Sequence, residues 1–135
     1  MKRFKNTPDP IPSLLKNEVF VFGANQLGMH IGGSAKAASI NYGAVMGEIH
    51  RTGRCYGIVT IYFETVNPMT FSELEKEFEL FFKQVELEKE KEFLLTKVGL
   101  GIAGWELTDI LACFNKFYNP KIHTNITIPI EFENA

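Results

Sequence analysis

Apolar residues along the chain gather in short blocks that glycine-rich or polar turns separate. A block of roughly 4–8 apolar and β-branched residues bounded by such turns is typical of a buried strand. The last block instead alternates isoleucine with polar residues, and Pro129 within it favours the edge of a sheet. The strands predicted in this way cover residues 18–22, 55–63, 93–98 and 122–132.

The first and last of the predicted helices are short. Residues 34–42 are rich in alanine, with Ser34 as a suitable N-cap and Gly43 to close the helix. The last helix begins at Thr108 as its N-cap and places apolar side chains on one side as far as Phe117.

The middle helix has the clearest pattern. A capping box opens it, formed either by Thr70 with Glu73 or by Ser72 with Glu75. Glutamate and lysine fill the opposite side, so the apolar stripe faces the core. The apolar positions at helical spacing are Phe71, Leu74, Phe78, Phe81, Phe82 and Val85.

Strands that alternate with helices indicate an α/β fold, here a three-layer α/β/α arrangement with a mixed sheet between helices. The length predicts one domain over residues 1–135. Residues 1–16 carry three prolines and are expected to form an extended surface arm. Residues 43–53 suggest an irregular connection.

The composition argues against several classes of function. The chain is 45% hydrophobic and 22% charged, as in globular proteins, and its net charge of −2 argues against a nucleic-acid duplex as partner. Neither a membrane-spanning run nor a signal peptide is visible, so a cytoplasmic location is expected. The two cysteines and three histidines are scattered, which indicates neither a metal nor another cofactor.

Two glycine-rich turns, residues 23–34 and 99–104, each follow a predicted strand and lead toward a helix. Ligands gather at the carboxyl ends of strands in such sheets, and glycine lets backbone N–H groups approach a phosphate closely. The turns match neither the dinucleotide fingerprint nor the P-loop, because Ser34 stands where the P-loop needs lysine. Together they predict a phosphate-binding site.

The side chains in these turns allow two interpretations each. Asn25 either meets a ligand or caps its own turn. His30 either donates to a phosphate and acts as an acid or base, or is an exposed loop histidine without a role, which is the more common case. Trp105 either stacks on a base or packs its loop against the sheet.

The remaining polar and sulfur-containing side chains do not identify a function. Arg51 and Arg54 either reach a phosphate or lie on the surface, whereas Cys55 and Cys113 sit in apolar patterns typical of core packing. No catalytic triad or carboxylate pair is recognisable.

The two turns also carry a family resemblance. Val-Phe-Gly-Ala-Asn at 21–25, Gly-Met-His at 28–30 and Gly-Ser-Ala-Lys-Ala-Ala at 33–38 resemble the opening motif of small phage and prophage "non-structural" proteins. Thr-Lys-Val-Gly-Leu-Gly-Ile-Ala-Gly-Trp at 96–105 resembles their second motif. The resemblance covers about residues 19–117. That group is in turn similar to macrodomains, which bind ADP-ribose on an α/β/α fold.

The resemblance implies roles for individual residues. Asn25 would correspond to the asparagine beside the distal ribose, and Trp105 to the aromatic residue next to the diphosphate loop. Gly32 and Gly33 would belong to the first glycine loop, and Gly99, Gly101, Ala103 and Gly104 to the diphosphate loop. The chain departs from the pattern at Ala24, Ile31 and Ile61, which stand where relatives carry serine, glycine and lysine.

We therefore expect a binder of ADP-ribose or a related, including cyclic, nucleotide, which in a phage would sequester a defence signalling nucleotide. One alternative is a hydrolase in which His30 and Asn25 position water. Another is a protein-interaction module, including a homo-oligomer, that docks through the arm or the tail. The predicted ligand-binding residues are Gly23, Asn25, Gly28, His30, Gly32, Gly33, Ser34, Gly99, Gly101, Ile102, Ala103, Gly104 and Trp105.

Overall fold

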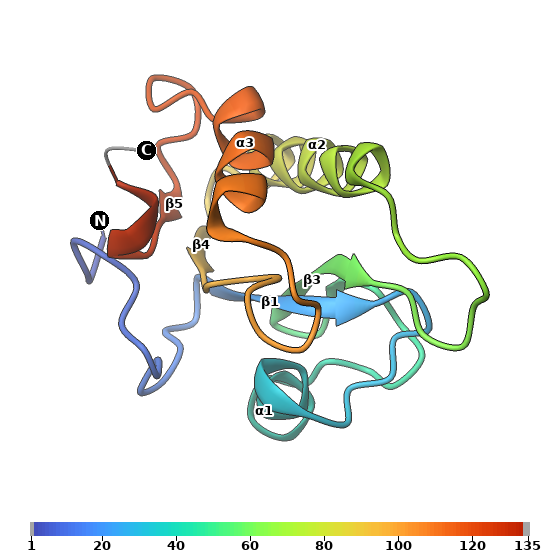
Figure 1. Ribbon diagram of the computed structural model, residues 1–135. Coiled ribbons are helices and arrows are strands. Elements are labelled where there is room, and N and C mark those ends of the chain that lie inside the picture. The colour runs from blue at the N-terminus through green and yellow to red at the C-terminus, as the bar shows by residue number, and fades with distance from the viewer. Residues whose placement is uncertain (1, 134–135) are drawn as a thin grey trace.

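A five-stranded mixed sheet runs through the middle of the protein, as the computed structural model shows for residues 2–133 (Figure 1). The strand order is β2-β3-β1-β4-β5, and every neighbouring pair is parallel except β2 with β3. The strands are β1 (Glu18–Asn25), β2 (His50–Thr52), β3 (Cys55–Ile61), β4 (Glu92–Leu95) and β5 (Ile126–Thr127).

Helices cover both faces of this sheet. The helix α1 (Gly33–Tyr42) lies on one face, and α2 (Phe71–Leu87) and α3 (Leu107–Phe117) lie on the other (Figure 1). This confirms the predicted α/β fold with a mixed sheet between helices.

The central strand β1 explains why the two helical layers have separate cores. Side chains alternate across a strand, so Val19 and Val21 enter the core beneath α2 and α3, whereas Phe20 and Phe22 enter the core beneath α1. All four side chains are buried, since β1 is paired on both edges and covered on both faces. The continuous apolar run thus predicted a central strand correctly.

Two helix ends agree with the sequence. The α2 helix begins with the capping box of Thr70 and Glu73, and α1 ends at Gly43 in the left-handed conformation. Leu74, Phe78, Phe81, Phe82 and Val85 of α2 are buried in the core, as their spacing predicted.

Two predicted N-caps are wrong. Gly32, not Ser34, is the N-cap of α1, because the helix already begins at Gly33. Glu106, not Thr108, is the N-cap of α3, and its backbone N–H donates to Asp109 Oδ2 at 3.3 Å. The carboxylate of Asp109, at the third helical position, therefore accepts from the N-cap residue, and Thr108 lies inside the helix.

Several strand bounds also differ. The strand β1 continues past Gly23 to Asn25 because these residues still pair with β3. The connection predicted to be irregular contains β2, a short antiparallel edge strand. The tail contributes only the two residues of β5 at the sheet edge, and a 3-10 turn (Ile130–Phe132) follows Pro129.

The described part of the arm before β1 contains neither helix nor strand, and it is not only a surface feature. Arg3 Nη2 lies 2.7 Å from Oε1 of the buried Glu18, and Ile11 is buried beside Phe20. The backbone N–H of Thr7 donates to Ile128 O at 2.9 Å. The arm and the tail, the two proposed docking segments, therefore pack on each other.

Within residues 2–133, none of the helices combines the length and the apolar character that crossing a bilayer requires.

Candidate functional site

Both glycine-rich turns open onto one cleft, which we call the glycine cleft. Its volume is about 380 Å³, and it lies beyond the carboxyl ends of β1, β3 and β4. Nine of the predicted ligand-binding residues line it: Gly23, Asn25, Gly32, Gly33, Ser34, Gly99, Gly101, Ile102 and Ala103. Gly28, His30, Gly104 and Trp105 do not.

The N-terminus of α1 forms one wall of the glycine cleft. Gly32 is its N-cap in an extended conformation, and no side chain caps the helix. By contrast, Thr70 accepts a hydrogen bond from the Glu73 N–H at the start of α2. The first N–H groups of a helix have no partner within it, so those of α1 remain available to an anion.

The Gly99 turn forms the opposite wall. Gly99 has a φ of 79°, and a Cβ atom there would lie 2.7 Å from Ile110 Cδ1. The turn is closed by hydrogen bonds from Gly104 N–H to Gly101 O and from Trp105 N–H to Gly99 O, both 3.0 Å. Neither bond uses the N–H groups of Gly101, Ile102 or Ala103. The positive φ favours glycine at 99, and a Cβ atom there would also displace the end of the Ile110 side chain.

Asn25 lies at the end of β1 and is buried. Its Oδ1 accepts hydrogen bonds from the N–H groups of Leu27 and Met29, each 3.1 Å, and its Nδ2 donates to Met29 O at 2.9 Å. The side chain thus caps its own turn, the second of the two interpretations. It still lines the cleft, where it holds the turn in shape.

His30 is not the exposed loop histidine that the sequence suggested, since only 2% of it is exposed. Its Nε2 lies 3.0 Å from Val45 O, its ring packs edge-on against Phe22, and its Nδ1 has no partner among the described residues. Met29 and Ile31 on either side of it line the cleft, whereas His30 faces the interior. The structure therefore does not place an imidazole where it could reach a ligand in this cleft.

Gly28 is needed for packing. A Cβ atom at Gly28 would lie 2.6 Å from the carbonyl carbon of Gly47, and the Gly47 N–H donates to Gly28 O at 2.8 Å. The first turn therefore touches the connection to β2 here, away from the cleft.

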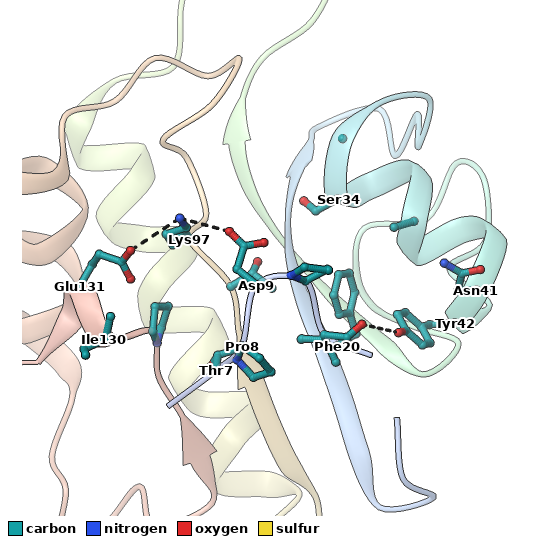
Figure 2. Close-up of a pocket in the computed structure, with 16 residues that line it drawn as sticks. Thr7, Pro8, Asp9, Phe20, Ser34, Asn41, Tyr42, Lys97, Ile130 and Glu131 are labelled. Carbon is teal, nitrogen blue, oxygen red and sulfur yellow. Dashed lines mark hydrogen bonds and ion pairs between the residues drawn. The ribbon is translucent and has the colours of Figure 1, made fainter. Parts of the chain in front are cut away.

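Lys97 is a cleft residue that the sequence analysis did not single out. It lines the glycine cleft and also a second hollow of about 590 Å³, which we call the arm-side cleft. The arm, α1 and the tail enclose this second cleft (Figure 2). The position of Lys97 two residues before Gly99 was the available signal.

The Lys97 ammonium lies 3.2 Å from Asp9 Oδ2 and 3.6 Å from Glu131 Oε2 (Figure 2). The hydrogen bond to Asp9 and the charge of Glu131 raise the pKa of Lys97 above its ordinary value. The side chain is therefore a cation at any physiological pH.

The other candidate groups lie elsewhere. Arg51 pairs with Glu88, and Arg54 donates to the carbonyls of Leu14 and Leu15, so neither arginine reaches the cleft. Cys55 and Cys113 are buried and unpaired, and burial raises the pKa of each thiol to about 12.

Among the described residues, no group of three or more histidine, cysteine, aspartate or glutamate side chains is placed to hold a metal ion. The polar side chains that line the glycine cleft are those of Asn25, Ser34, Thr60 and Lys97, beside its backbone N–H groups.

Comparison with models of known protein families, with curated protein sequences and with solved structures returns no match to this chain.

Proposed function

We propose that the glycine cleft binds the phosphate groups of a nucleotide of the ADP-ribose class, cyclic forms included. The observation that carries the proposal is the N-terminus of α1, which has no side-chain cap and opens into a cleft shared with the Gly99 turn. Free N–H groups and the positive end of the helix dipole meet there, and both favour a phosphate.

The walls of the cleft suit the rest of such a ligand. Ile31, Phe63 and Ile102 line it, and Ile102 is 87% exposed. Small-molecule sites combine mostly apolar walls with a few polar anchors, in volumes of roughly 300–1,000 Å³. The resemblance of the two turns to those of macrodomain-like phage proteins supports ADP-ribose chemistry over other nucleotides. Sequestration of a defence signalling nucleotide is the role that this binding would serve in a phage.

The proposal is for binding rather than hydrolysis. His30, the one acid or base considered for an attacking water, packs against Phe22 and does not line the cleft. The raised pKa values of the two buried thiols leave them protonated near neutral pH.

Thermal shift and calorimetry with ADP-ribose, isomers of cyclic ADP-ribose and cyclic oligonucleotides test the proposal. A ligand present at 100 times its dissociation constant should stabilise the protein by about 2.7 kcal/mol. If none of these compounds stabilises the protein or releases heat, the proposal is overturned.

A pair of glycine variants locates the site. A Cβ atom at Gly101 or at Gly47 meets nothing within 4 Å, but only Gly101 lines the cleft. Gly101→Val should therefore weaken binding while the protein stays folded. Gly47→Ala introduces strain at a φ of 90° outside the cleft, so it controls for a loss of stability and should bind normally. Equal effects of the two variants would place the ligand elsewhere.

A further inference from the structure

The glycine cleft and the arm-side cleft meet at three residues that line both, Gly33, Ser34 and Lys97. Figure 2 shows Lys97 reaching toward Asp9 of the arm, with Ser34 at the start of α1 on the far side of Asp9. A ligand held at the start of α1 would therefore lie at a junction that Lys97 also lines.

Lys97 carries the only charged side chain among the described residues that line the glycine cleft. The other polar groups there are neutral, namely backbone N–H groups, the hydroxyls of Ser34 and Thr60 and the Asn25 amide. A hydrogen bond to a charged group is stronger than one between neutral groups. Lys97 is thus the group able to distinguish an anionic ligand from a neutral one.

The present partners of Lys97 hold it weakly. The side chains of Lys97, Asp9 and Glu131 are 39%, 73% and 41% exposed, and ion pairs exposed to this degree contribute little to stability. The arm itself is fixed near Asp9, since Thr7 is bonded to Ile128 and Ile11 is buried. A rotation of the exposed Asp9 side chain would therefore free one side of the Lys97 ammonium without moving the arm.

We propose that Lys97 selects phosphate-bearing ligands at the junction of the two clefts, and that Asp9 competes with the phosphate for its ammonium. This inference rests on the proposed function, because it assigns the charge recognition within the same site. Asp9, Glu131 and Lys97 together carry one net negative charge, which repels an approaching anion. The repulsion decreases once the phosphate replaces Asp9 at the Lys97 ammonium.

Titration of ADP-ribose into four proteins tests the inference: wild type, Lys97→Met, Lys97→Arg and Asp9→Asn. Lys97→Met should bind roughly tenfold to a hundredfold more weakly, the effect of one charged hydrogen bond. Lys97→Arg keeps the charge and should recover most of the affinity. Asp9→Asn removes the competitor, so it should bind several-fold more tightly than wild type.

The double variant Lys97→Met/Asp9→Asn separates competition for Lys97 from a general change of charge. If Asp9 acts through Lys97, its removal should give much less gain when the lysine is already absent. Thermal melts of the free proteins show that each variant is folded, and the two side chains changed here, Lys97 and Asp9, are both solvent-accessible.

The outcomes are distinct. Wild-type binding with unchanged affinity in Lys97→Met overturns this inference and leaves the proposed function standing. An equal gain from Asp9→Asn with and without Lys97 overturns the competition. No binding by wild type overturns the proposed function and this inference together.

Discussion

The indole Nε1 of Trp105 donates a 2.7 Å hydrogen bond to the backbone carbonyl of Thr60. This bond joins the end of the Gly99 turn to the last residues of β3, across the floor of the glycine cleft. Trp105 does not line the cleft and packs against the core beneath α3. Of the two roles considered for this residue, the structure shows packing of the loop against the sheet.

Trp105→Phe should therefore lower the free energy of unfolding by about 1 kcal/mol, the usual net value of one hydrogen bond. The phenyl ring keeps most of the packing, so the loss reports on the bond to Thr60. Urea denaturation followed by circular dichroism measures it. A variant as stable as wild type that binds ADP-ribose more weakly would instead indicate stacking on the ligand.

The capping box of α2 yields a second prediction. The Thr70 hydroxyl accepts from the Glu73 N–H at 3.2 Å, and Glu73 Oε1 accepts from the Thr70 N–H at 2.9 Å. Thr70→Ala should cost about 1 kcal/mol of stability because it leaves the helix start uncapped. Ser72→Ala is the matched control, since Ser72 lies inside the helix, where alanine is the better residue. The denaturation midpoints of both variants test this prediction. A larger loss of stability from Ser72→Ala than from Thr70→Ala would contradict the assignment of Thr70 as the N-cap.

Glu92 provides a prediction about pH. Burial raises the pKa of this carboxyl above its ordinary value of 4.5, although the Thr127 hydroxyl donates to Glu92 Oε2 at 2.7 Å. When the pKa of a carboxyl is higher in the folded state than in the unfolded state, its contribution to stability is fully present below the unfolded pKa. That contribution is lost as the pH rises through the folded pKa. At neutral pH the charged carboxylate of Glu92 therefore destabilises the folded state.

Glu92→Gln should consequently be at least as stable as wild type at pH 7, and its relative advantage should shrink as the pH falls through the raised folded pKa toward about 4.5. Stability measured by chemical denaturation at pH 4 and pH 7 checks this. Glu79→Gln is a useful comparison, because Lys76 lowers the pKa of Glu79 and the same substitution there removes a favourable charge. A marked destabilisation of Glu92→Gln at pH 7 would contradict the prediction.

The buried thiols yield a fourth prediction. Burial raises the pKa of Cys55 and of Cys113 from 9.0 to about 12, so neither forms a thiolate in the native protein at pH 8. An aromatic disulfide reagent should label both slowly in the native state and rapidly in guanidinium chloride. Because the folded pKa values are raised, stability should also fall as the pH rises from 9 toward 12. Equally fast labelling in both states would show that the thiols are accessible.

Local patterns in the sequence were sufficient for the three helices and for every strand except β2. The run at Val19–Phe22 predicted the central strand, and the phenylalanines of α2 predicted the helix face that meets the core. Such patterns work because burial follows the period of the element, two in a strand and 3.6 in a helix. The two glycine-rich turns were likewise recognisable, and the structure brings nine of their thirteen named residues to one cleft.

Only the tertiary structure decided which side chains in those turns face the glycine cleft. Irregular backbone has no period, so nothing in the local sequence distinguishes His30, which turns inward against Phe22, from Ile31, which lines the cleft. Lys97 could not be identified from the sequence for a related reason. Its charge pairing involves Asp9 and Glu131, which are distant in sequence and contact it only in the folded protein. The sequence by itself determined the helical layers, because these follow from local periodicity, and it located the two turns through their glycines at the ends of strands. The charge and the contacts within the cleft depend on residues brought together by folding, which local pattern does not encode.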